Sequence, residues 1–265
     1  MAKNEMSFLN HLEELRWHLV RSFLAICFVA IFIFIFSNFI YEKFLFAHLS
    51  GDFPTYQWLC NLARTFGFES DFCTVSLMNR MQSLAPTGQI MNLIWTSLIL
   101  GVIVAFPYIL WEMWKFISPG LHKKERKKSR AFIFYASFLF FVGVLFSYYV
   151  IAPLSVYFFY NFEITDMIEN KFDFKSHVNL ITSTILGVSL MFELPVVIYF
   201  LTKMGLVTPS FLKKYRKIAF VLVLTLSAII TPPDIASQII VTIPIMILYE
   251  ISIFISKRVL KNESK

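Results

Sequence analysis

The chain has few charged residues, few glycines and no motif for nucleotide or metal chemistry. Charged residues make up 15% of its 265 residues, against about 25% in soluble domains. The sequence has no Gly-rich phosphate loop and no HExxH motif, and its five histidines are scattered. No apolar stretch holds a paired Ser and His or a pair of Asp. These absences argue against an ATPase, a metalloenzyme and an intramembrane protease, and we predict no cofactor.

Long apolar stretches dominate what is present. Hydrophobic residues make up 57% of the chain, and 31 residues are Phe. About 20 apolar residues in a helix cross a hydrocarbon core of about 30 Å. Six stretches of roughly this kind occur, at 19–40, 90–111, 131–152, 180–202, 218–231 and 235–255. We therefore predict an all-α integral membrane protein with six transmembrane helices in one polytopic domain, 1–258, followed by a tail, 259–265.

The basic residues are sorted by side. Nineteen of the 24 Lys and Arg fall in 1–21, in 112–130, in 203–217 or after residue 255. Only five fall in the two segments predicted to cap the outer side, 41–89 and 153–178. Because cytoplasmic loops carry the excess of Lys and Arg, both termini are predicted to be cytoplasmic. The net charge of +7 then reflects topology and contact with anionic lipid, and we predict no nucleic-acid partner.

The ends and interiors of the stretches carry further signals. An apolar stripe at helical spacing precedes the first stretch and predicts a short interfacial helix, with a solvated lead-in as the alternative: Phe8, Leu12, Leu15 and Leu19. Proline lies inside three stretches, at Pro107, Pro195 and Pro244. Proline removes a backbone donor and kinks a helix, so a cupped bundle is predicted. The stretch 218–231 is short for a span, which predicts a thinned bilayer or a submerged outer turn.

Two polar side chains lie within the apolar stretches. Glu193 is a carboxylate inside the fourth stretch, where an ionised acid costs about 2.5–3.5 kcal/mol. It is predicted either to belong to a substrate path or proton-sensitive site, or to hydrogen-bond a neighbouring helix for packing. Gln238 in the sixth stretch is expected to hydrogen-bond between helices.

Two of the three cysteines, Cys60 and Cys73, lie in the long outer segment. An oxidising outer compartment would allow a disulfide between them, and two free thiols are the alternative.

Four motifs, in order, resemble those of the TatC family, the multi-spanning subunits of the twin-arginine protein translocase. The first is the run His11-Leu12-Glu13-Glu14-Leu15-Arg16, which is similar to the HLxELR signature. The second is Trp114–Leu121 followed by Lys124-Glu125-Arg126, similar to the first cytoplasmic loop. The others are Phe192-Glu193-Leu194-Pro195 and Thr231-Pro232-Pro233-Asp234 with Ser237-Gln238.

The resemblance implies a receptor for signal peptides with consecutive arginines, in a bacterial inner membrane. It places the two receptor acids at Glu14 and Glu125, where a carboxylate can take a guanidinium in a bidentate fork. Leu12, Arg16, Phe116 and Pro119 fall on the same recognition surface. Single-span partner subunits of the TatA and TatB type are expected at the last hairpin, which holds Pro233, Asp234 and Gln238. The resemblance also implies self-association in a multimeric receptor complex and export driven by the proton motive force.

Two positions depart from the family pattern. His18 stands where a second Arg is common, and His48 stands where a Pro is common in the first outer loop. Two other classes of function are weighed against the receptor. An ion-gradient-coupled carrier of small solutes would want inverted repeats and several membrane acids, and a membrane enzyme would need a catalytic constellation.

Overall fold

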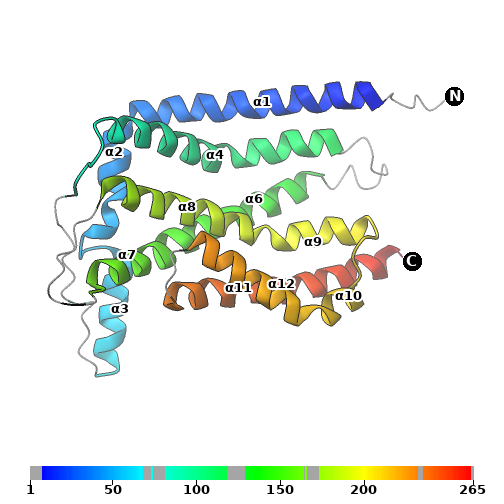
Figure 1. Ribbon diagram of the computed structural model, residues 1–265. Helices are drawn as coiled ribbons and strands as arrows, with labels where there is room; N and C mark the ends of the chain where they lie inside the picture. Colours follow the sequence, from blue (N-terminus) through cyan, green and yellow to red (C-terminus); the bar gives the residue numbers. More distant parts are fainter. Residues whose placement is uncertain are drawn as a thin grey trace. The chain divides into compact units, whose positions relative to one another are not determined.

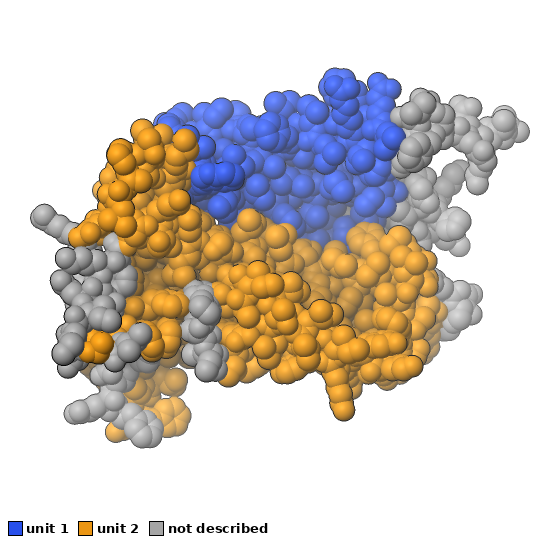
Figure 2. Space-filling view, in the orientation of Figure 1, with its two compact units in different colours: residues 1–37, 93–138 blue, residues 38–92, 139–265 orange. Residues whose placement is uncertain are grey.

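A computed structural model describes residues 8–67, 73, 81–117, 129–163, 165, 173–231 and 235–263. Within these ranges the backbone is helical apart from turns, caps and one isolated bridge between Gln82 and Asp173. The prediction of an all-α protein is therefore confirmed. The chain forms two compact units, Met1–Ser37 with Leu93–Phe138 and Asn38–Asn92 with Leu139–Lys265, which Figure 2 shows in different colours.

The helices follow one another along the chain as Figure 1 shows. Their bounds are α1 Phe8–Ile35, α2 Ser37–Ile40, the π-helix η1 Tyr41–Leu45, the 3₁₀-helix η2 Ala47–Leu49, α3 Pro54–Thr65, α4 Gly88–Ile117, α6 Ser129–Phe146, the π-helix η5 Ser147–Ile151, α7 Ala152–Asn161, α8 Phe174–Phe192, α9 Leu194–Lys203, α10 Pro209–Lys214, α11 Arg216–Ile230 and α12 Ile235–Glu263.

Five helical segments in the described ranges are long and apolar enough to cross a membrane. They are Leu12–Ile35, Gly88–Ile117, Phe132–Asn161, Phe174–Lys203 and Ser237–Lys261. The predicted fifth stretch, 218–231, falls in α11, whose 15 residues correspond to about 22 Å of helix. This length leaves α11 outside the group, so the count of six spans stays a prediction.

The N-terminal helix differs from its prediction. The interfacial helix and the first span were expected to be separate elements, but α1 runs without a break for 28 residues. No glycine or proline interrupts it, so nothing in the local sequence ends the helix between the two parts. In the same unit, α1 packs closely on α4 at Gly101. A Cβ there would lie 3.0 Å from the carbonyl oxygen of Ile26 and 3.2 Å from Cβ of Ala30.

The second unit packs through small residues and hydroxyl groups. A Cβ at Gly143 in α6 would lie 2.8 Å from Cα of Ser189 in α8, so only glycine fits this contact. The apolar cluster around it comprises Ile151, Val188, Met191, Phe192, Val223, Val241 and Ile245. Hydroxyl pairs also join helices, at 2.8 Å between the Oγ atoms of Ser155 and Ser237 and at 2.8 Å from Thr202 to Ser256.

In this unit one proline lies at the start of a helix and another lies inside one. Pro195 is in the first turn of α9, and α8 ends at Phe192, so the predicted fourth span is two helices meeting at Glu193. Pro244 lies within α12. Pro107, which belongs to the first unit, likewise lies inside its helix, α4.

The segment 41–89, which is predicted to lie on the outer side, is held by side chains that donate hydrogen bonds to backbone carbonyls near Pro153. Pro153 has no N–H, and the carbonyls of Tyr148 and Tyr149 precede it by one helical turn. The Nε2–H of His48 donates to the Tyr148 carbonyl at 3.0 Å, and the hydroxyl of Thr55 in α3 donates to that of Tyr149. These bonds fasten η2 and α3 to the π-helix η5.

Tyr56 and a disulfide complete this attachment. The buried Tyr56 hydroxyl lies 2.9 Å from the Pro153 carbonyl oxygen and 3.0 Å from that of His48. Burial raises the pKa of Tyr56, so the hydroxyl keeps its proton and donates. Cys60 of α3 is joined to Cys73 by a disulfide. Of the two alternatives left open by the sequence, the structure has the disulfide.

Candidate functional site

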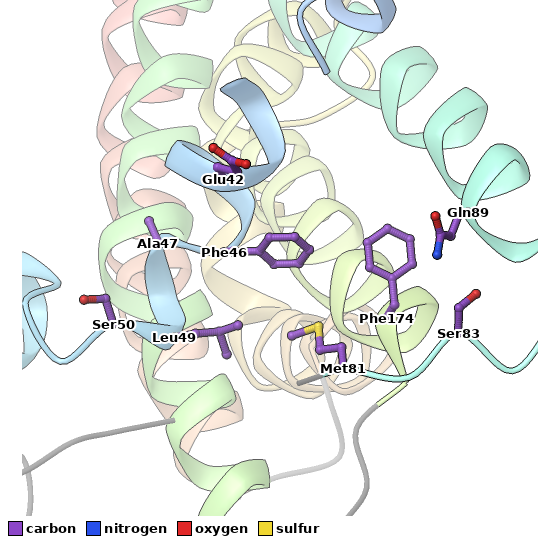
Figure 3. A pocket seen from close by; sticks show the side chains of 9 residues that line it. All are labelled: Glu42, Phe46, Ala47, Leu49, Ser50, Met81, Ser83, Gln89 and Phe174. Atoms are coloured by element: carbon purple, nitrogen blue, oxygen red, sulfur yellow. The ribbon is translucent and has the colours of Figure 1, made fainter. Parts of the chain in front are cut away.

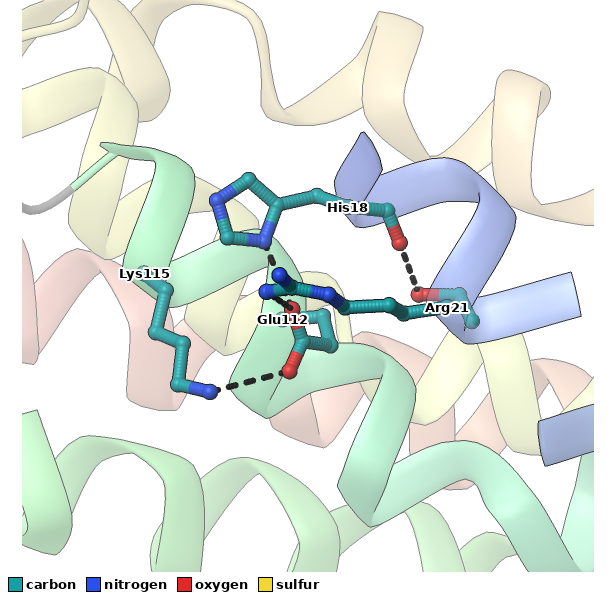
Figure 4. Close-up of polar contacts among 5 residues, drawn as sticks. His18, Arg21, Glu112 and Lys115 are labelled. Atoms are coloured by element: carbon teal, nitrogen blue, oxygen red, sulfur yellow. Dashed lines mark hydrogen bonds and ion pairs between the residues drawn. The ribbon is translucent and has the colours of Figure 1, made fainter. Parts of the chain in front are cut away.

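Charged side chains gather on one stripe of α1. Glu14, His18 and Arg21 follow one another at spacings of four and three residues, which places them on one face of the helix. Glu112 and Lys115 lie three residues apart near the C-terminal end of α4, in the same compact unit. Figure 4 shows His18, Arg21 and Lys115 directed toward the carboxylate of Glu112. We call these four residues, His18, Arg21, Glu112 and Lys115, the Glu112 cluster.

The Glu112 carboxylate is sealed by its partners. Its residue is only 1% exposed. Oε2 lies 2.6 Å from Nδ1 of His18, and Oε1 accepts from Nζ of Lys115 at 3.0 Å. Nη1 of Arg21 lies 3.9 Å from Oε2. Since an ionised carboxylate only accepts hydrogen bonds, Nδ1 of His18 carries the proton in this contact.

These contacts explain why a carboxylate is tolerated here. Removing one partner of a buried ion pair costs about 3–5 kcal/mol, because an uncompensated charge is left behind. Ring contacts hold the partners in place as well. Nζ of Lys115 lies 3.4 Å from the centroid of the Trp111 ring, and the rings of His18 and Phe116 meet edge to face at 6.2 Å. The cluster therefore fixes α1 against the end of α4.

Glu14 lies one turn before His18 and differs from Glu112 in its partners. Its side chain is half-buried. The Oε2 atom is buried and has no hydrogen-bond partner among the residues that the structure describes. A half-buried carboxylate with a vacant acceptor is unfavourable unless a donor arrives. Glu14 is therefore poised to accept a cationic donor, and Glu112 is not.

The other residues predicted for this surface are placed only in part. Leu12 and Arg16 are exposed on α1, and Phe116 is half-buried beside His18. The structure thus brings Phe116 together with the stripe that carries Glu14. Glu125 and Pro119 lie outside the described residues.

The intramembrane acid lies where α8 meets α9. Glu193 is 8% exposed, and the backbone of Phe140 hydrogen-bonds its carboxyl group. Its Oε1 atom is buried without a hydrogen-bond partner in the described ranges. Both interpretations from the sequence, a substrate path and a packing role, remain predictions for this residue.

Of the three residues predicted to lie in the partner-docking hairpin, the structure describes only Gln238. Nε2 of Gln238 in α12 donates to the carbonyl of Leu224 in α11 at 3.0 Å, which ties the two helices together. Pro233 and Asp234 lie outside the described residues. The exposed apolar side chains of α11 include Val221, Leu222 and Ile229.

A pocket of about 570 Å³ lies in the second unit, near the outer segment. Figure 3 shows the rings of Phe46 and Phe174 facing one another across it, at a centroid distance of 6.0 Å, with Gln89 beyond Phe174. Its one charged lining residue, Glu42, is exposed. No group of three potential metal ligands occurs in the part of the chain that the structure describes.

Sequence reasoning missed the Glu112 cluster. In the sequence Glu112 is only the first residue of the basic segment 112–130, and His18 is notable only as a departure from a family pattern. The two residues are 94 positions apart, so no local spacing links them. The available signal was a lone acid at the end of an apolar stretch with a lysine three residues later.

Comparisons with known proteins agree with this architecture. The family described as "Sec-independent protein translocase protein (TatC)" matches residues 10–244. The TatC protein of Blattabacterium sp. subsp. Periplaneta americana is 43% identical over 262 residues, 98% of each chain. TatCy of Bacillus subtilis is 33% identical over 265 residues, covering all of this chain and 94% of that protein.

A solved structure is similar in fold. The crystal structure of the twin arginine translocase receptor TatC in DDM matches with a TM-score of 0.73 and 29% identity. The match covers 92% of this chain and 98% of that chain.

The long apolar helices are those of a multi-spanning membrane protein, and the family match places it in the protein-transport class, which is not a class of enzymes. The chain belongs to the TatC family of Sec-independent protein translocase proteins.

Proposed function

We propose that this translocase subunit binds twin-arginine signal peptides of folded precursor proteins at Glu14 and Glu125. The observation that carries the proposal is the state of Glu14, a half-buried carboxylate whose Oε2 atom has no partner in the described part of the chain. A guanidinium can occupy both oxygens of such a group in a bidentate fork, and a lysine ammonium cannot. The site therefore prefers arginine to lysine.

The surroundings of Glu14 support a peptide ligand. Leu12 is 45% exposed on the same helix, and the ring of Phe116 lies beside the stripe. These apolar groups can contact the residues that flank a pair of arginines. Glu125 and Pro119 belong to the proposed surface through the family resemblance.

The rest of the proposed activity concerns partners and energy. Single-span subunits of the TatA and TatB type dock at the α11–α12 hairpin, where the exposed apolar face of α11 supports the assignment. Several copies of the chain assemble in a receptor complex. Because the sequence has no nucleotide-binding loop, we assign the driving force to the proton motive force. Both termini are assigned to the cytoplasmic side of a bacterial inner membrane.

The test is export of a folded reporter that carries a twin-arginine signal. Glu14→Gln and Glu125→Gln are expected to lower export by at least tenfold while the proteins insert at normal levels. Glu13→Gln is the matched control, because Glu13 is the exposed neighbour of Glu14 and the change in charge is the same. Normal export in both receptor variants, or equal loss in the control, would refute the proposal.

A further inference from the structure

We propose that the Glu112 cluster sets how strongly Glu14 binds arginine side chains, by fixing the net charge beside it. The inference rests on the proposed function and adds a specificity-determining group to it. Glu112 itself is not a receptor for the peptide, because it is 1% exposed and its oxygens are taken by His18 and Lys115.

The spacing of the residues brings the cluster close to Glu14. Side chains four apart on a helix have Cβ atoms about 5–6 Å from each other, so His18 and Glu14 are neighbours. Arg21 continues the same stripe one turn further on. Charges at such distances act on one another, because partly buried groups are screened less than groups in bulk water.

The cluster carries more positive than negative charge. Glu112 supplies one negative charge, whereas Lys115 and Arg21 each supply one positive charge. The cationic side chains are partly open to solvent, at 55% for Arg21 and 38% for Lys115. They therefore repel an arriving arginine while Glu14 attracts it.

Such a balance suits a receptor that must release its cargo. A lone carboxylate would hold any cation, whereas a carboxylate next to a surplus of positive charge retains only a ligand with a good bidentate fit. Glu112 keeps that surplus small. Loss of its charge should weaken binding, and loss of the Lys115 charge should strengthen it.

The experiment measures the dissociation constant of a synthetic twin-arginine signal peptide for the full-length protein in nanodiscs at low salt. Lys115→Gln is expected to bind about fivefold more tightly, the size of one interaction between close charges that water screens almost fully. Glu112→Gln is expected to bind about fivefold more weakly, and the double variant should return to the wild-type value. Lys213→Gln is the control, since it removes one charge from an exposed lysine on α10 and should leave the affinity unchanged.

Two results would overturn the inference. Unchanged affinity in Lys115→Gln, which keeps the His18–Glu112 bond and leaves an amide N–H that can donate to Oε1 of Glu112, is the first. The second is weaker binding in Glu112→Gln that persists in the double variant with Lys115→Gln. That result would mean that Glu112 acts through packing and not through charge. Glu14→Gln distinguishes a failure of this inference from a failure of the proposed function. If Glu14→Gln loses peptide binding, the proposed function is supported even where the charge variants have no effect. No binding by the wild type would instead count against the proposed function.

Discussion

The attachment of the outer segment should weaken in acid because it depends on a neutral histidine. Burial lowers the pKa of His48 from 6.5 to about 4, the carbonyls of Tyr148 and Leu45 opposing this only in part. When the segment opens, His48 returns to its ordinary pKa and takes up a proton more readily than in the closed state. The free energy needed to open the segment is therefore at its maximum above pH 6.5, and it falls as the pH drops toward 4.

The magnitude follows from the size of the shift. A difference of about 2.5 pKa units corresponds to about 3 kcal/mol at full effect, and to about 2 kcal/mol at pH 5. The second figure is about a thirtyfold increase in the open population. Hydrogen exchange of the α3 amides, Pro54–Thr65, measures it after correction for the intrinsic pH dependence of exchange.

The control is His48→Gln. Its amide can still donate to the Tyr148 carbonyl but does not titrate, so protection of α3 should change little between pH 7 and pH 5. Wild-type protection that is constant within twofold over this range, or an equal drop in His48→Gln, would refute the reasoning.

Three further predictions concern stability, each measured as the thermal unfolding midpoint in detergent. Tyr56→Phe removes the donor to two backbone carbonyls and should cost about 1–3 kcal/mol; an unchanged midpoint would contradict the assigned bonds. Gly143→Ala should cost about 1–3 kcal/mol despite a better helix propensity, because the new Cβ would meet backbone at 2.8 Å; stabilisation would show that the contact relaxes. Replacing Cys60 and Cys73 by Ser opens a loop with a sequence separation of 13 and should cost about 3 kcal/mol, and the loss should match that of reducing the wild type.

The membrane helices could be predicted from the sequence because lipid leaves few choices. A backbone in hydrocarbon must satisfy its own hydrogen bonds, so a long apolar stretch such as 90–111 must become a helix, here within α4. Proline positions were informative as well, and Pro195 marks the junction of α8 and α9.

Other features depend on contacts that no local pattern specifies. The separation predicted within α1 was wrong, because an amphipathic stripe does not say whether a helix continues beyond it. The pairing of His18 with Glu112 depends on how α1 packs against α4 at Gly101. Glu14 and Phe116 were assigned through family motifs, and only the structure showed that Oε2 of Glu14 has no hydrogen-bond partner among the residues it describes.

The most direct test of the account is photo-crosslinking to a twin-arginine signal peptide from a reactive residue placed at position 124, which leaves Glu125 in place, with and without Glu14→Gln. The account predicts a crosslink to the peptide with two arginines, little or none to a matched peptide with two lysines, and a large reduction in the Glu14→Gln background. Equal crosslinking of both peptides, or a crosslink that Glu14→Gln leaves intact, would contradict it.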